Sequence, residues 1–315
     1  MGDSDKQFKH KWIVPLLASI ACIVWGTPYK TLKLFYNELN ISKDNYGSHY
    51  SGQILVAVAL RFLLAGIIVL TFAACRKQKI FDLSRKNWGQ VAIMGLVSTT
   101  ISYIFFNIGN VNISSSINSA IIGQSGILFG VVLSCIFYKD EKFTWLKTLA
   151  FTLGVIGLLA SQVDPDKLLS NPFSKFTFSG EGMMMIHGVV FAIATMIGKK
   201  ITGDLDPFIM TGWNLVIGSV LLCITGLILG GSLTSMSWNI KGFGLLIFLA
   251  VASAIPFSLW YWCNQYMEVS KLSMYKFLIP VSGSVIGILF GERFTWTLAV
   301  SLVCVCASIF MIGKS

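Results

Sequence analysis

The sequence predicts an all-α integral membrane protein in which ten transmembrane helices form two inverted five-helix repeats. Three observations support this prediction. Of the 315 residues, 55% are hydrophobic and only 12% are charged, whereas about a quarter of the residues in a soluble domain are charged. The mean hydropathy of +0.73 leaves too few polar side chains to cover a soluble fold. Finally, apolar segments recur along the whole chain, and one short motif is repeated about half a chain apart.

Apolar segments of membrane-spanning length account for most of the chain. The hydrocarbon core of a bilayer is about 30 Å thick, and a helix of about 20 apolar residues crosses it with its backbone polar groups paired. The ten segments of this kind are residues 12–33, 54–74, 89–109, 117–138, 145–162, 182–198, 208–230, 242–265, 272–290 and 294–312. The longest stretches between them, 35–52 and 163–181, are too short to form a soluble enzymatic domain.

Lysine and arginine residues set the expected orientation, because they are enriched in cytoplasmic loops. With both termini in the cytoplasm, 16 of the 24 basic residues lie on the cytoplasmic side, and Lys276 is counted among them. The net charge of +10 is then explained by the basic residues that orient the spans, and not by a nucleic-acid-binding surface. We therefore expect lipid around the protein and no nucleic-acid partner. The lack of an Arg-rich presequence fits a bacterial cytoplasmic membrane.

An internal repeat divides the chain into two halves. The sequence EKFTW at Glu141–Trp145 returns as ERFTW at Glu292–Trp296, and each copy follows one apolar span and opens the next. Because five spans is an odd number, the second copy begins on the opposite side of the membrane, so the repeats are inverted. We expect a first repeat at residues 1–163, an external linker at 164–181 and a second repeat at 182–315.

Short motifs within these spans resemble those of the EamA-type transporters of the drug/metabolite transporter superfamily. They are Trp25-Gly26 followed by Pro28, the ALRFLLA sequence at Ala59–Ala65, and Ile279-Pro280-Val281 ahead of Gly291-Glu292. The resemblance covers nearly the whole chain and implies a central cavity and transport of small metabolites, often export of amino acids or related compounds. The first half departs from the family pattern, because it has Gly123–Gly126 where the family usually has a proline.

Prolines and glycines inside the spans predict bending and close helix packing. A proline frees a backbone carbonyl of its helix, which favours a bend. The candidate bending elements are Pro28, Pro256 and Pro280. Gly283, Gly287 and Gly291 lie four residues apart and therefore form a ridge of small residues on one face of the ninth span, where another helix can approach closely. Packing without any hinge function is the alternative interpretation of this ridge.

Polar side chains inside the spans predict where a central cavity lies, because a polar group that faces lipid costs free energy. Tyr103 and Asn107 share a face of the third span, and Trp260 and Asn264 share a face of the eighth. The further neutral candidates are Asn118 and Gln124. A hydrogen bond to a neighbouring helix is the alternative role for each amide.

Titratable groups inside the spans are few. Arg61 is the only charge expected well inside a span, where it would pair with a substrate carboxylate or with backbone carbonyls, or hold neighbouring helices together. His187 is the one candidate that titrates near physiological pH, and a structural hydrogen bond is its alternative role. All Asp and Glu residues fall in loops or at helix ends, so proton coupling through a buried carboxylate is not supported.

Aromatic residues away from the span ends are candidates for the cavity walls. They are Trp25, Tyr29, Trp213 and Trp260. Such rings can enclose an apolar or cationic solute by stacking or by cation–π attraction. Filling space between helices is the alternative interpretation.

Motifs for enzyme chemistry, nucleotide-driven transport and metal binding are absent from the sequence. There is no G-x-x-x-x-G-K-[ST] loop, no His-x-x-His and no Cys-x-x-Cys. We therefore expect no enzymatic activity, no cofactor and no metal. The leading hypothesis is a monomeric secondary transporter that exports a small polar metabolite through a neutral, aromatic-lined cavity. The alternatives are a non-transporting membrane scaffold or sensor, and a facilitator for a quaternary ammonium compound or another solute held by aromatic rings.

Overall fold

The computed structural model describes residues 3–137, 144–164, 166, 176–201, 205–267, 272 and 274–314. Every regular element within these residues is a helix. Eight helical segments are long and apolar enough to cross a membrane, and two shorter apolar helices, Tyr275–Leu289 and Trp296–Ile312, complete the described set of ten. The predicted fold class is thereby confirmed. The predicted linker at 164–181 falls largely outside the described residues, as does Glu141 of the repeated motif.

The helices of the first half build five spans, of which four are composite, and the second of them includes the short 3-10 turn η1 (Gly47–His49). The elements are α1 (Asp3–Gly26), α2 (Pro28–Glu38), α3 (Lys43–Tyr46), α4 (Tyr50–Cys75), α5 (Arg85–Met94), η2 (Gly95–Ile101), α6 (Ser102–Asn112), α7 (Ser116–Ile122), α8 (Ser125–Phe137) and α9 (Trp145–Gln162). The first span is α1 with α2, and Pro28 starts α2 at a position where its missing N–H is not needed. The third span is α5, η2 and α6, in which η2 is a π-helical segment.

The helices of the second half build the other five spans. The elements are η4 (Phe178–Gly182), α10 (Met183–Ile201), α11 (Pro207–Ile228), α12 (Ile240–Cys263), η5 (Met274–Phe277), α14 (Leu278–Leu289) and α15 (Trp296–Lys314). Pro256 lies inside α12, which continues through it. Pro280 lies in the first turn of α14, directly after the 3-10 turn η5.

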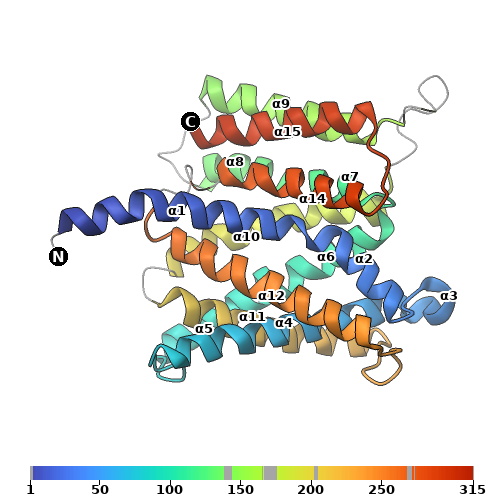
Figure 1. Ribbon diagram of the computed structural model, residues 1–315, viewed down its shortest axis with the longest axis horizontal. Helices are drawn as coiled ribbons and strands as arrows, with labels where there is room; N and C mark the ends of the chain where they lie inside the picture. The colour runs from blue at the N-terminus through green and yellow to red at the C-terminus, as the bar shows by residue number, and fades with distance from the viewer. Residues whose placement is uncertain are drawn as a thin grey trace.

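The helix contacts have the pattern that an inverted repeat requires. Each span of the first half corresponds to the span five positions later, so α1 corresponds to α10, α6 to α12 and α8 to α14. Accordingly, α1 packs against α12 and α14, and α10 packs against α6 and α8. The equivalent spans α4 and α11 pack against each other, as do α9 and α15. Figure 1 shows α9 and α15 side by side and both chain termini at the same end of the bundle. We refer to the opposite end as the distal end.

Two matched crossings bring backbones into direct contact at glycine pairs. A Cβ atom at Gly26 of α1 would lie 2.7 Å from the backbone nitrogen of Gly283 of α14. In the equivalent crossing of α10 with α8, a Cβ atom at Gly188 would lie 2.7 Å from the backbone nitrogen of Gly126. Small residues are needed there because van der Waals contact between backbones is the main attraction between helices in lipid.

The predicted glycine ridge on α14 faces α7 along only part of its length. A Cβ atom at Gly283 would meet the side chain of Ala120 at 2.7 Å, and one at Gly287 would meet Ile117 at 2.5 Å. Gly291 is set apart from this contact, because it follows the end of α14 with φ +82° and has open space around it. Its role is therefore to turn the chain, since few residues other than glycine adopt that conformation.

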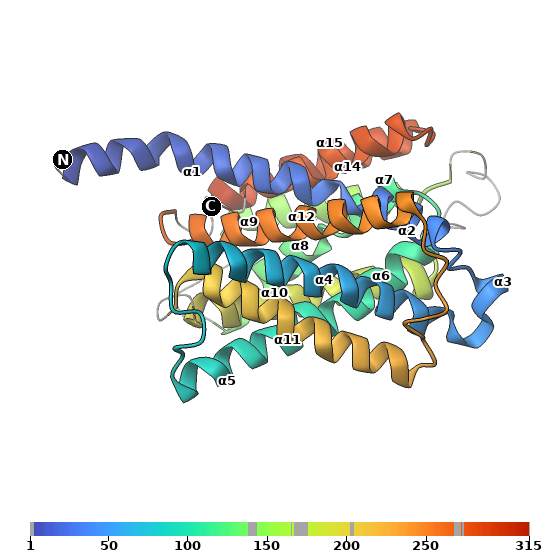
Figure 2. The same cartoon turned by 60° about the horizontal axis from the view of Figure 1, so that its bottom comes forward.

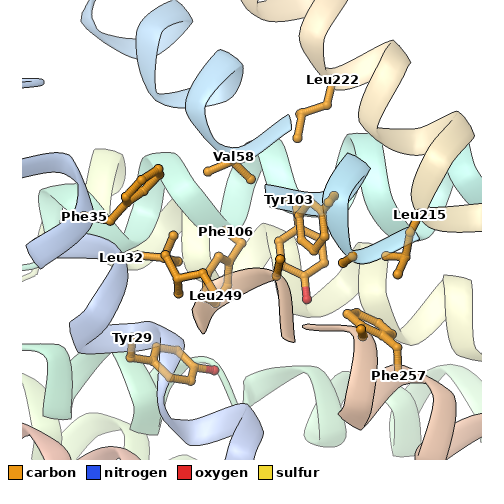
Figure 3. Packing of buried hydrophobic residues seen from close by; sticks show 14 of the residues in the cluster. Tyr29, Leu32, Phe35, Val58, Tyr103, Phe106, Leu215, Leu222, Leu249 and Phe257 are labelled. Atoms are coloured by element: carbon orange, nitrogen blue, oxygen red, sulfur yellow. The ribbon is translucent and has the colours of Figure 1, made fainter. Parts of the chain in front are cut away.

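Apolar side chains fill the centre of the bundle and also cover its outside. The largest buried cluster joins α2, α4, α6 and α12, and Figure 3 shows Tyr103, Phe106 and Phe257 of this cluster. Exposed apolar residues lie on the outer faces of many helices, among them Ile67, Phe72, Ile224, Phe248 and Val303. An outer surface of this kind is expected where lipid replaces water as the solvent. In Figure 2 the start of α1 extends past the other helices at the end that carries the termini.

Candidate functional site

A cavity lies between the two halves of the bundle. The first half lines it with residues of α1, α2, α4, α6 and the break between α7 and α8, and the second half lines it with residues of α10, η5 and α14. Its volume is about 70 Å³, well below the roughly 300–1,000 Å³ of typical small-molecule sites. In this conformation the cavity is therefore smaller than a site that holds a metabolite.

Six of the residues predicted from the sequence meet in this cavity. They are Trp25, Tyr29, Arg61, Tyr103, Gln124 and His187. Trp260 packs behind them, with its ring centre 5.3 Å from that of Trp25. The break between α7 and α8 places Gln124 here, at the position where the sequence lacks the expected proline.

Two of the other predicted residues lie away from the cavity. The indole nitrogen of Trp213 donates to the carbonyl oxygen of Ile80 at 2.7 Å, and its ring packs against Phe81 and Trp88. Asn264 follows the last residue of α12 and is half-buried. Spacing along a helix indicates which residues share a face, but it does not indicate what that face contacts.

Two predicted amides bond to neighbouring groups within the bundle. Asn107 is fully buried, accepts a hydrogen bond from the hydroxyl of Tyr36 at 2.9 Å, and donates to the carbonyl oxygen of Tyr103 at 2.6 Å. Asn118 accepts from Gln162 of α9 at 3.4 Å and lines a second cavity near the distal end. Both match the alternative role of an amide that joins helices.

Arg61 places a buried cation in the cavity wall. Its side chain is 2% exposed, and its Nε donates to the hydroxyl of Ser253 on α12 at 2.8 Å. The guanidinium carbon lies 6.0 Å from the ring centre of Tyr103. The Nη1 atom is buried and has no hydrogen-bond partner among the described residues. Arg61 thus joins α4 to α12 while part of its hydrogen-bonding capacity stays unused.

Lys276 is a second buried cation, whereas by sequence it counts only among the basic residues of the cytoplasmic side. It is 8% exposed, and its Nζ lies 4.8 Å from the ring centre of Trp260 and 5.3 Å from that of Phe191. Among the described residues no hydrogen bond or ion pair of Nζ is found. Cation–π contacts contribute about 0.5–2 kcal/mol, which is less than the several kcal/mol that burial of an ammonium group costs.

The sequence does contain a signal for this position of Lys276. The residue lies inside the predicted span 272–290, four residues before Pro280. A lysine near a span end is usually interpreted as extending to the interface, but here the 3-10 turn η5 directs it among aromatic rings. Arg61 is therefore not the only charge inside the bundle, and the cavity is electropositive rather than neutral.

His187 is held in place by the segment that follows the π-helical turn. Its Nδ1 lies 2.9 Å from the carbonyl oxygen of Ser102 and 2.8 Å from the hydroxyl oxygen of the same residue. A carbonyl oxygen only accepts, so Nδ1 carries the proton of this bond and Nε2 is left as the acceptor of the neutral ring. The ring also packs against Phe106 and Phe191. His187 therefore lines the cavity and also makes a structural hydrogen bond to Ser102.

Glu292 joins the two halves at the distal end. Its carboxylate accepts from Lys30 Nζ at 2.9 Å, from the backbone nitrogen and hydroxyl of Ser116 at 2.8 and 2.6 Å, and from the Ser115 hydroxyl at 3.0 Å. Partial burial raises the pKa of this carboxyl, but the hydrogen bonds from Ser116, Lys30, Ile117 and Ser115 outweigh burial and hold the pKa below its usual value. We call Glu292, Lys30, Ser115 and Ser116 the distal cluster.

Comparisons with known proteins bear on both halves of the chain. Residues 12–161 and residues 178–314 each match the EamA-like transporter family. An uncharacterized transporter of Archaeoglobus fulgidus is 26% identical over 287 residues, which cover 90% of this chain and 92% of the relative. A WAT1-related chloroplastic protein of Arabidopsis thaliana is 29% identical over 251 residues, which cover 78% of this chain and 59% of the relative.

Further similarity comes from a bacterial relative and from a solved structure. The uncharacterized transporter YvbV of Bacillus subtilis is 25% identical over 302 residues, which cover 95% of this chain and 90% of the relative. One solved crystal structure superposes with a TM-score of 0.65 at 14% sequence identity, over 95% of each chain. At this identity the superposition supports the fold alone.

Proposed function

Because the chain belongs to the EamA-like transporter family, and is a membrane transporter rather than an enzyme, we propose that it exports a small polar metabolite by alternating access. Amino acids and related compounds are the first substrates to test. The observation that carries the proposal is the cavity lined by residues of both repeats. Inverted repeats that surround one site can open it to each side of a membrane in turn.

The described conformation fits a closed intermediate of such a cycle. The cavity is too small to admit a metabolite, and the distal cluster joins α2 and α7 of the first half to the segment after α14. Rocking of the halves would break the distal cluster and enlarge the cavity toward the distal end. The glycine crossings of α1 with α14 and of α10 with α8 are smooth contacts at which the halves could move past each other.

The chemistry of the cavity disfavours both alternatives from the sequence. A scaffold or sensor does not need Arg61 and Lys276 buried at membrane depth, where each charge costs free energy. A quaternary ammonium compound would meet two like charges in the same cavity. The basic residues of the loops support an orientation with both termini in the cytoplasm. We further propose a bacterial cytoplasmic membrane as the location and a monomer as the oligomeric state.

Transport by purified protein in proteoliposomes tests this function. Flux of a labelled mixture of the twenty amino acids and their 2-oxo acid counterparts is expected above that of protein-free vesicles. Replacing Gln124 by alanine should lower the flux at least tenfold, because Gln124 is an uncharged hydrogen-bonding side chain in the cavity wall. The Trp260→Ala variant should also be impaired, since it removes the ring behind Trp25 and Lys276.

A matched aromatic variant provides the control. Trp213→Phe alters a ring that lies outside the cavity, so its flux should equal that of the wild type at equal reconstitution. Unchanged flux in both Gln124→Ala and Trp260→Ala would remove the cavity as the transport site. Flux no greater than that of empty vesicles for every labelled compound would contradict the proposed substrate class.

A further inference from the structure

Resting on the proposed transport function, we infer that the cavity selects a small organic acid, with Lys276 binding the carboxylate and Arg61 reinforcing the positive potential. The inference concerns the net charge of the ligand. The cavity is expected to prefer a monocarboxylate with an apolar body over the corresponding amino acid or amine. It follows from the mostly apolar residues that line the cavity, and from the absence of a carboxylate partner for Lys276 and Arg61 among the described residues.

The first step is the unpaired state of Lys276. Its Nζ contacts the faces of Trp260 and Phe191 and makes no hydrogen bond or ion pair with any described residue. Ring faces compensate a buried ammonium only in part, whereas a carboxylate can accept its hydrogen bonds and neutralise its charge. A ligand with an anionic group therefore gains an interaction that none of the described residues provides.

The second step is the charge of the whole lining. Arg61 is a second cation in the same cavity. Among the described residues it is hydrogen-bonded to the neutral Ser253, and its Nη1 has no partner. Among the described residues that line the cavity there is no Asp or Glu. An ammonium group on the ligand would therefore find no carboxylate there, and both a cation and a zwitterion would be bound less well than an anion.

The third step is the shape of the remaining wall. Trp25, Phe106, Phe191 and Ile279 supply apolar surface, and Tyr29 and Gln124 supply neutral polar groups. Such a wall suits an aromatic or branched aliphatic body more than a sugar or a phosphate, which would leave many polar atoms without partners. The combination points to a 2-oxo acid or a similar monocarboxylate.

Ligand binding to purified protein in detergent tests the inference with compounds that share one body and differ in charge. The aromatic set is phenylpyruvate, phenylalanine and phenethylamine, and the branched set is 4-methyl-2-oxopentanoate, leucine and 3-methylbutylamine. A ligand that binds only the folded protein raises the melting temperature by an amount that grows with its affinity and its concentration. At least one acid should raise it at tenfold lower concentration than its amino acid, and the amines should have no effect.

Two variants locate the effect. Lys276→Gln should weaken binding of the acid at least tenfold, and Lys276→Arg, which keeps the charge, should retain part of it. Arg293→Gln removes an exposed cation outside this cavity and should bind the acid as the wild type does. If Lys276→Gln does not fold, the shifts in melting temperature that the acids, amino acids and amines cause in Lys276→Arg and in the wild type still test the preference for an acid.

The outcomes separate this inference from the transport proposal. Preferential binding or flux of phenylalanine, leucine or an amine would overturn the inference while leaving transport intact. Binding of an acid without any flux in proteoliposomes would support the inference and contradict the transport proposal. Failure of both acids to shift the melting temperature, or equal binding of an acid by wild type and Lys276→Gln, would overturn the assignment of Lys276.

Discussion

Replacing Gly188 by valine is expected to cause a large loss of stability, because Gly188 of α10 packs directly against the backbone of α8. A Cβ atom there would lie 2.7 Å from the backbone nitrogen of Gly126 and 3.0 Å from its Cα. Backbone atoms cannot rotate away as a flexible side chain can, so the two helices must separate along the crossing. Overpacking of a tight core costs about 1–3 kcal/mol, and here lost contacts along both helices add to it.

Thermal unfolding of the purified protein in detergent measures this effect. Gly244 of α12 offers a matched control, because a Cβ atom there meets nothing within 4 Å. Gly244→Val should therefore leave the melting temperature nearly unchanged, whereas Gly188→Val should lower it markedly. Equal melting temperatures for the two variants would show that the α10–α8 crossing is not a tight contact.

The inverted repeat extends this prediction to a second position. Gly26 and Gly283 form the equivalent crossing of α1 with α14, and a Cβ atom at Gly26 would also lie 2.6 Å from the carbonyl oxygen of Ile279. Gly26→Val should therefore destabilise the protein as strongly as Gly188→Val. A large effect at only one of the two sites would mean that the halves are not equivalent in packing.

The number of spans could be predicted from the sequence because a bilayer imposes one strong requirement on each helix. Every backbone polar group must be paired within the segment, so apolar length alone identifies a span. The repeated motif adds the inversion, since it gives an odd number of spans in each half. The glycine crossings were only partly predictable. A spacing of four marks Gly283 and Gly287, and also Gly126 and Gly130, whereas Gly188 has no glycine four residues away and meets Gly126 only in the folded bundle.

The cavity was less predictable because helical spacing does not determine which helix a face contacts. Tyr103 and Asn107 share a face, yet Tyr103 lines the cavity while Asn107 is bonded to Tyr36. The charge of the cavity was missed for a different reason. Lys276 lies near the start of a span, where lysine normally extends to the interface, and only the 3-10 turn η5 places it beside Trp260.

Glu292→Gln is expected to produce the second large effect, since it removes the charge from the distal cluster. The carboxylate accepts hydrogen bonds from Lys30 and from the first turn of α7, and hydrogen bonds to charged groups contribute about 1.5–3 kcal/mol each in buried settings. Glutamine can accept hydrogen bonds only at its carbonyl oxygen, its amide nitrogen would face donors that the other carboxylate oxygen now binds, and it cannot neutralise Lys30. We therefore expect a loss of about 1–3 kcal/mol at neutral pH.

The pH dependence of this loss has a defined sign. The folded-state pKa of Glu292 lies below its ordinary value, so the stabilisation is fully present above the ordinary carboxyl pKa. It is lost as the pH falls through the lower, folded-state pKa. The difference in melting temperature between wild type and Glu292→Gln should accordingly be largest near neutrality and shrink in acid. Asp82→Asn, which alters an exposed pair with Lys79 at 3.5 Å, should change the melting temperature little at any pH.

Accessibility of the distal cluster distinguishes a closing contact from a merely stabilising one. If Glu292 keeps the distal end shut, Ser115→Cys should react faster with a membrane-impermeant maleimide in the Glu292→Gln background than in the wild type, each corrected for labelling of the native cysteines. A loss of stability without faster labelling would mean that Glu292 only caps α7. Faster labelling would mean that the carboxylate must release Lys30 and the α7 backbone whenever the two halves open the cavity toward the distal side.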